Sequence, residues 1–306
     1  MKKDFLSLFD HPRSDVEAIL EDARRLKAEL KSPTRERPLL GQTLAMIFEK
    51  PSLRTRVTFE TGVKQLGGAS VYLAPEDIRL GARETVADIA CNLSRWVDMI
   101  VARTFSHRDL LELAEHATIP VINGLSDLLH PCQILADCQT LLEHKGRLSG
   151  LTVAFIGDGN NVVNSWIEAA AVLDLNFRLA CPPGYEPDAA ILERAREMAR
   201  GRIEILHDPR AAAADADAVY TDVWTSMGQE AETQARRTAF RGYQVNEQLM
   251  AAAKPDALVM HCLPAHRGEE ISAEVLDGPH SVVLDQAENR LHAQKSLMVW
   301  LARRSS

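Results

Sequence analysis

The run Leu44-Ala45-Met46-Ile47-Phe48 is uninterrupted and apolar, and Glu49-Lys50-Pro51-Ser52-Leu53-Arg54-Thr55-Arg56 follows it directly. An apolar run of this length is typical of a strand buried in a sheet. Val57 and Val63 then recur at a spacing that suits one face of a helix, which places Ser52 near its N-cap. The stretch predicts a strand, a turn and a helix, the repeating unit of a parallel α/β sheet.

The turn of this unit carries groups that bind anions. Ser52 and Thr55 supply hydroxyls and Arg54 supplies a guanidinium. The first amides of the helix and its dipole point to the same place, so a phosphate group suits the set. A capped surface helix with solvated arginines would have the same local sequence, and the motif alone leaves both interpretations open.

Strands and helices alternate along the rest of the chain. An amphipathic helix opens it, with capping-box spacing at Ser14 to Glu17. Further strands are expected at 69–73, 99–102, 120–122, 151–157, 176–180, 203–206, 218–221, 257–260 and 281–284. Helices are expected at 85–95, 109–116, 127–144 and about 289–303. The expected fold class is α/β, with two domains that each hold a parallel sheet covered by helices, linked by interdomain helices.

Composition limits the class of protein and its partners. The 306 residues suffice for two domains, and 46% hydrophobic with 25% charged residues is typical of a globular chain. With 35 basic and 43 acidic residues the net charge is −8, so we expect neither nucleic acid nor an anionic membrane as a partner. No apolar run reaches the length of a membrane span, and the first residues do not resemble a signal peptide. Five cysteines without a CxxC pair indicate a reducing, cytoplasmic location.

The segment Gly157-Asp158-Gly159-Asn160-Asn161 suggests a dinucleotide-binding turn, because it follows a strand and precedes a helix. It lacks the third glycine, and no acidic residue ends the next strand, where a ribose hydroxyl would be held. We therefore favour a turn that brings Asn164 to the carboxyl edge of the sheet. A nicotinamide-dependent dehydrogenase remains the alternative from another class.

Two histidine motifs and one acidic motif complete the candidate chemistry. His130-Pro131-Cys132-Gln133 and His261-Cys262-Leu263-Pro264 fit no zinc spacing, so no metal is expected, and His130 could instead donate to a carbonyl oxygen. Asp222 to Gly228 suits an α-amino acid, although an Asx-turn would look the same. The polar stretch from Trp224 to Gln244 is either a binding loop or a surface excursion that contains a helix.

These motifs, in this order, resemble the aspartate/ornithine carbamoyltransferase family over essentially the whole chain. Residues 48–56 resemble its carbamoyl phosphate motif, 130–133 its HPxQ motif, 222–228 its DxxxSMG loop, and 261–264 its HCLP motif. Residues 285–290 resemble its last active-site segment. The SMG sequence favours ornithine as the acceptor, and a related enzyme for N-acylated ornithine or putrescine is the alternative.

The resemblance implies transfer of a carbamoyl group from carbamoyl phosphate to the δ-amine of L-ornithine, without cofactor or metal. Its catalytic residues would be Arg54, Arg103, His130, Asp222 and Cys262. Those binding carbamoyl phosphate would be Ser52, Leu53, Arg54, Thr55, Arg79, Arg103, His130, Gln133, Cys262, Leu263 and Arg290. Those binding ornithine would be Asn164, Asp222, Ser226, Met227, Cys262 and Leu263.

The resemblance also implies domains and assembly. Residues 1–133 would bind carbamoyl phosphate, with a C-terminal helix at about 287–306 packing back on them, and 134–286 would bind ornithine. A homo-oligomer, expected to be a trimer, would share its sites between subunits. Leu53 stands where the family usually has a threonine, and Arg79 where many members have a glutamine that reaches a neighbour's site. The extra cation at Arg79 could offset the missing hydroxyl.

Overall fold

The computed structural model describes residues 3–30, 32, 35–226 and 230–305. The chain divides into two compact units, Met1–Gln139 with Glu288–Ser306, and Thr140–Ala287. Sequence analysis had set the boundaries at 133/134 and 286/287. The α/β fold with two helix-covered parallel sheets is confirmed, and each unit is described separately below.

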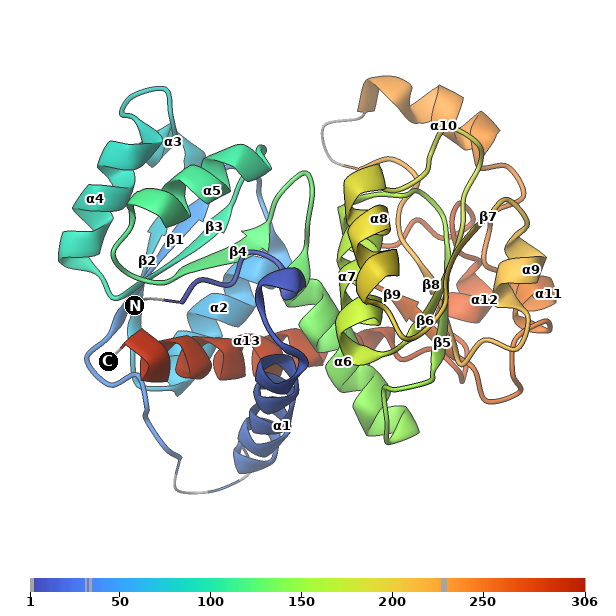
Figure 1. Cartoon of the computed structure of the whole chain (residues 1–306), viewed down its shortest axis with the longest axis horizontal. Helices are drawn as coiled ribbons and strands as arrows, with labels where there is room; N and C mark the ends of the chain where they lie inside the picture. The colour runs from blue at the N-terminus through green and yellow to red at the C-terminus, as the bar shows by residue number, and fades with distance from the viewer. Residues whose placement is uncertain (1–2, 31, 33–34, 227–229, 306) are drawn as a thin grey trace. The chain divides into compact units, whose positions relative to one another are not determined.

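The first unit is built on a four-stranded parallel sheet in the order β2-β1-β3-β4. Its strands are β1 (Thr43–Phe48), β2 (Ala69–Leu73), β3 (Met99–Arg103) and β4 (Val121–Leu125). Its helices are η1 (Leu8–Asp10), α1 (Arg13–Glu29), α2 (Leu53–Gln65), α3 (Pro75–Ile78), α4 (Val86–Trp96) and α5 (His107–His116). Helices α4 and α5 cover one face of the sheet together, where they bury apolar residues against β1 and β3 (Figure 1).

The second unit is built on a five-stranded parallel sheet in the order β7-β6-β5-β8-β9. Its strands are β5 (Thr152–Ile156), β6 (Asn176–Ala180), β7 (Ile203–Leu206), β8 (Ala218–Thr221) and β9 (Leu258–His261). Its helices are α7 (Asn161–Leu173), α8 (Ala189–Met198), α9 (Pro209–Ala213), η2 (Glu230–Glu232), α10 (Thr233–Ala239), α11 (Glu247–Met250) and α12 (Ala273–Leu276). Helices α6 (Pro131–Lys145) and α13 (Val283–Ser305) each have residues in both units.

Each sheet has a point where the strand order changes direction. In the first unit the chain runs from β1 outward to β2 and then returns to β3 on the other side of β1. In the second it runs from β5 through β6 to β7 and returns to β8 on the other side of β5. Open α/β sheets bind ligands at the carboxyl ends of the strands beside such a switch point. Ligand sites are therefore expected at the carboxyl ends of β1 and β3 in the first unit, and of β5 and β8 in the second.

One expected strand is absent, and two expected helices are present but begin differently. Residues 281–284 do not form a strand: Ser281 makes a single bridge to Val259, and α13 begins at Val283. The helix expected from residue 127 begins at Pro131, because proline has no amide hydrogen to donate and fits only the first helical turn. No capping box forms at Ser14, since α1 already begins at Arg13 after Pro12.

The stretch from Trp224 to Gln244 contains η2 and α10, so it does include a helix. Its use as a binding loop stays a prediction. In the part of the chain that the structure describes, no helix is both long and apolar enough to cross a membrane.

Candidate active site

The switch point of the first unit brings Arg103 beside the turn after β1. Phe48 and Arg103 are register partners at the ends of β1 and β3, and the Glu49 amide donates to the Arg103 carbonyl over 2.9 Å. Ser52 caps α2 as expected, its Oγ accepting from the Thr55 amide at 3.2 Å. Arg103 is buried although it is charged, which requires nearby groups that stabilise its charge.

His130 is the histidine of the first unit on which the charges of three arginines act. It lies immediately before α6 and is buried. Burial, and then the positive charges of Arg290, Arg103 and Arg54, hold its pKa well below the ordinary value of 6.5. The imidazole is therefore neutral at physiological pH, so one ring nitrogen can donate a hydrogen bond without adding a charge. The charges of three guanidiniums act on this neutral donor, a combination that suits a multiply charged anion with a carbonyl oxygen beside it.

Arg290 is locked by its neighbours. Its side chain donates to Gln133 Oε1 and, over 3.0 Å, to Thr55 Oγ1. Gln133 in turn donates to Asp137 Oδ1 at 2.8 Å. All four side chains are buried, and they come from α2, α6 and α13. The chain thus fixes the guanidinium plane of a residue that is 157 positions from Gln133 in sequence.

Leu53 and Arg79, which were also predicted to bind carbamoyl phosphate, are exposed. Leu53 is 75% exposed at the first position of α2. Arg56 lies over the Tyr72 ring, 3.7 Å from its centroid. Arg79 is exposed and caps α3 in a left-handed conformation with φ 42°. A contribution of Arg79 to a neighbouring subunit's site stays a prediction.

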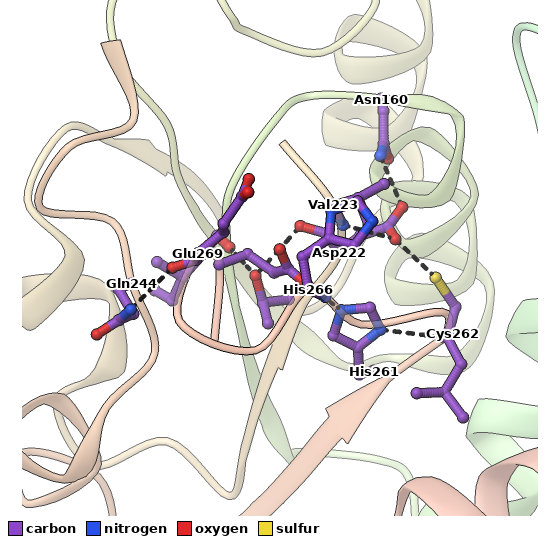
Figure 2. A network of polar contacts seen from close by, with 12 residues as sticks. Asn160, Asp222, Val223, Gln244, His261, Cys262, His266 and Glu269 are labelled. Carbon is purple, nitrogen blue, oxygen red and sulfur yellow. Dashed lines mark hydrogen bonds and ion pairs between the residues drawn. The ribbon is translucent and has the colours of Figure 1, made fainter. Parts of the chain in front are cut away.

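In the second unit, Asp222 follows β8 at the switch point and is the hub of a polar network (Figure 2). Asp222 Oδ2 accepts from Asn160 Nδ2 at 3.0 Å, and Asp222 Oδ1 accepts from the backbone amide of Val223 at 2.8 Å. Cys262 Sγ donates to the same Oδ1 at 3.0 Å. The carboxylate and the thiol predicted from two distant motifs are thus brought together, with a third residue, Asn160, that sequence analysis had not selected.

The remaining residues predicted for ornithine lie near this network in sequence or structure. Asn164 is buried in the first turns of α7, and its Oδ1 accepts from the Asp188 amide at 3.0 Å. Ser226 is half-buried two residues after Trp224. Met227 lies outside the described residues. Leu263 has φ 57°, a left-handed conformation that non-glycine residues adopt at an energetic cost.

Two groups hold the Leu263 turn: His261, which sequence analysis quoted in a motif without giving it a role, and Glu270, which it missed. His261 Nδ1 accepts from the Leu263 amide at 2.8 Å, and its Nε2 lies 3.1 Å from Glu270 Oε1, which also accepts from the His266 amide. His261 and Glu270 are buried. The donor at Leu263 fixes the imidazole tautomer, with the proton on Nε2 facing the carboxylate. The signal in the sequence was a histidine placed directly after the strand expected at 257–260.

Within the described ranges, the side chains of Asp222, His261 and Cys262 form a group whose ligand atoms lie within 4.8 Å of one another. Both ring nitrogens of His261 already have partners, so the imidazole has no lone pair available for a cation. Cys132, in the other histidine motif, donates to the Asn123 carbonyl, and burial raises its pKa to about 12. Its thiol is therefore neutral, whereas thiolate is the form that binds metals.

The glycine turn after β5 is filled by the protein itself. Asn160 Oδ1 accepts from the Val162 and Val163 amides, which a pyrophosphate would otherwise use. A Cβ on Gly159 would lie 2.4 Å from the Glu186 carbonyl carbon and 2.5 Å from the Pro187 nitrogen. The glycine thus serves close packing of the chain against residues 185–187 rather than the approach of a dinucleotide.

Two family models match the chain. The aspartate/ornithine carbamoyltransferase carbamoyl-P binding domain matches residues 3–143, and the Asp/Orn binding domain of the same family matches residues 149–301. The chain belongs to the aspartate/ornithine carbamoyltransferase family. Among curated members of this family, the ornithine carbamoyltransferase of Syntrophus aciditrophicus is 56% identical over 298 residues, which cover 97% of this chain and 99% of that protein. That of Thermococcus kodakarensis is 54% identical over 97% of this chain and 95% of that protein.

Solved structures of family members agree. The ornithine carbamoyltransferase from Pyrococcus furiosus superposes with a TM-score of 0.94 and 52% identity, covering 97% of this chain and 96% of that one. The family resemblance inferred from the motifs is confirmed. The catalytic and binding roles given above to individual residues of this chain stay predictions.

Proposed function

We propose that this protein transfers the carbamoyl group of carbamoyl phosphate to the δ-amine of L-ornithine, which yields L-citrulline and phosphate. The observation that carries the proposal is the switch point of the first unit, where Arg103 ends β3 beside the turn after β1 and Arg290 donates to Thr55 in the first turn of α2. The charges of both, with that of Arg54, also act on the buried imidazole of His130. A phosphoryl group beside a polarisable carbonyl is the ligand that such a set of donors suits. Family membership and the names of its relatives support ornithine as the acceptor.

In the first unit, the arginines would bind the phosphate by charge-assisted hydrogen bonds. These bonds strengthen as the C–O bond to the leaving group breaks and negative charge grows on the phosphate. Ser52 and Thr55 would add hydroxyls and Leu53 its amide. His130 would donate to the carbonyl oxygen as it becomes an oxyanion, since fixed donors there stabilise the tetrahedral intermediate. Gln133 would position the carbamoyl group.

In the second unit, Asp222 with Asn164, Ser226 and Met227 would bind the α-amino and α-carboxyl groups of ornithine. The carbonyls of Cys262 and Leu263 would accept from the δ-amine and aim its lone pair. An alkyl ammonium has a pKa near ~10.4, so at pH 7.5 only about one ornithine in a thousand carries a neutral δ-amine, a cost of roughly 4 kcal/mol. Binding among carbonyls away from bulk water would reduce that cost by lowering the amine's pKa.

The test is an assay of carbamoyl transfer with ornithine, N-acetylornithine, putrescine and aspartate offered in parallel. Turnover of ornithine alone is the expected result. Turnover of another amine would keep the phosphate site but replace the acceptor. No turnover of any of them would contradict the proposal.

We further propose a homotrimer that contains shared sites. Edge strand β2 leaves apolar surface open: Val71 is 47% exposed, and Leu53 and Val57 on α2 are also exposed. An exposed edge strand with apolar side chains favours association with another chain. Light scattering should find three chains per particle, and a fully active monomer would contradict this assembly.

We also propose that the protein works in the cytoplasm and in arginine metabolism. All five cysteines are free thiols, which suits a reducing compartment. Arginine metabolism is proposed because the proposed substrate is ornithine and the proposed product is citrulline. The same site residues would serve an enzyme of arginine synthesis and one of arginine breakdown.

A further inference from the structure

Arg236, on α10, is a buried cation with three oxygen partners. Its Nη1 donates to Asp158 Oδ2 at 2.9 Å and to the Trp224 carbonyl at 3.1 Å, and its Nε donates to Glu232 Oε2 at 2.9 Å. The guanidinium carbon also lies 5.1 Å from the centroid of the Tyr185 ring. The side chains of Arg236 and Asp158 are 7% and 9% exposed, whereas that of Glu232 is 59% exposed. Arg236 therefore has two partners in the interior and one, Glu232, at the surface.

The two inner partners of Arg236 come from the two strand ends at the switch point. Asp158 follows β5, and Trp224 follows β8. Both partners lie close to Asp222 along the chain or through one hydrogen bond. Trp224 is two residues after Asp222. Asn160 is two residues after Asp158, and its Nδ2 donates to Asp222 Oδ2 at 3.0 Å (Figure 2). One guanidinium thus joins both segments on which the position of the Asp222 carboxylate depends.

We propose that Arg236 and Asp158 are positioning residues for the amino-acid acceptor: together they hold Asp222 and the Trp224–Ser226 segment in the geometry that binds the α-amino and α-carboxyl groups of ornithine. Neither residue is assigned a contact with substrate. The inference rests on the proposed function and deepens it.

Stability alone does not account for this pair. Removing two charges from water costs free energy that their attraction often fails to recover, so apolar residues of similar volume would serve stability equally well. Burial raises the pKa of Asp158 to about 6, and the Arg236 charge opposes that rise. The pair instead fixes the orientation of the two segments it joins. A planar guanidinium can hold a carboxylate and a carbonyl in one fixed geometry, whereas a lysine ammonium on a flexible stem cannot.

The test compares Asp158→Asn and Arg236→Lys with Glu232→Gln in the full chain. Glu232→Gln is the matched control, because it changes a carboxylate on the same guanidinium but at the exposed side, where ion pairs contribute little. For each protein, initial rates give kcat and the KM of each substrate, and a thermal melt checks folding. We expect Asp158→Asn and Arg236→Lys to raise the KM for ornithine about tenfold, the usual effect of losing one charge-assisted hydrogen bond, and to leave the KM for carbamoyl phosphate unchanged. Glu232→Gln should match wild type in kcat and in both KM values.

A purely structural role predicts a different pattern. It would lower the melting temperature and the amount of active enzyme, which reduces kcat without separating the two KM values. That pattern, an unchanged ornithine KM, or an equal effect of Glu232→Gln would overturn the inference. If the wild-type protein does not use ornithine at all, the proposed function fails first, and this failure is visible before any variant is made.

Discussion

His292, on α13, should make the stability of the protein depend on pH. Its side chain is fully buried, and neither ring nitrogen makes a hydrogen bond to any described residue; the nearest carboxylate oxygen, Glu288 Oε1, is 3.5 Å away. Burial, with the charges of Lys295 and Lys27, lowers the pKa of His292 from 6.5 to about 4, and Glu288 opposes this shift. The folded protein therefore holds a neutral imidazole.

The sign and size of the effect follow from the two pKa values. Between pH 6.5 and about 4 the unfolded chain binds a proton at His292 that the folded chain does not. Acid thus favours unfolding: the stabilising contribution is complete above pH 6.5 and is lost as the pH falls towards 4. The difference of about 2.5 pKa units corresponds to about 3 kcal/mol, a large share of the stability of an ordinary domain.

The assay is urea unfolding followed by circular dichroism and tryptophan fluorescence at half-unit steps from pH 4.5 to 7.5. His292→Gln keeps a similar size but cannot take up the proton, so it should remove about 3 kcal/mol of the pH dependence whatever its effect at pH 7. His116→Gln is the control, because His116 is exposed on α5 in the same unit. If His292→Gln and wild type lose stability in parallel on acidification, the reasoning about burial is refuted.

Three further predictions concern the proposed reaction. Asp222→Asn should lower kcat/KM for ornithine by about 100-fold or more, since it neutralises the charge that would pair with the α-ammonium, while the KM for carbamoyl phosphate changes little; steady-state rates measure both, and equal changes would contradict the assignment. Arg290→Lys should raise the KM for carbamoyl phosphate about tenfold, because an ammonium cannot hold Thr55 and Gln133 together, and an unchanged KM would count against it. Where chemistry limits the rate, turnover should rise from about pH 6 to above 8 as the δ-amine loses its proton, and a flat profile would remove amine deprotonation from the account.

Strands were predicted correctly both at the edges of the sheets, where the expected 69–73 and 203–206 coincide with β2 and β7, and in their interiors. Residues 44–48, 99–102 and 218–221 are short apolar runs followed by polar residues, and burial on both faces requires this composition. The apolar residues 282–284 have a similar local pattern, yet a helix begins at Val283. So short an apolar run satisfies a strand and a first helical turn equally well, and only tertiary contacts decide between them.

The candidate site could be predicted residue by residue only as far as motifs reach. Ser52 was recognisable because an N-cap has a local signature, and the structure confirms it. The contact of Asn160 with Asp222 spans 62 positions, and no spacing rule relates the two. Arg236 was hidden for the same reason: in sequence it is one of two adjacent arginines, and only folding shows that Arg236 turns inward while Arg237 pairs with Glu269 at the surface.

The close packing at Gly159 has a consequence for redesign. Because residues 185–187 occupy the space above the turn, replacing residues within the Gly157–Asn161 segment would not create room for a nucleotide. An engineer who wished to install a cofactor on this scaffold would first have to shorten or reroute the connection that follows β6. Under the proposed function this edge of the second sheet binds an amino acid, and a new chemistry there would need a new loop before a new side chain.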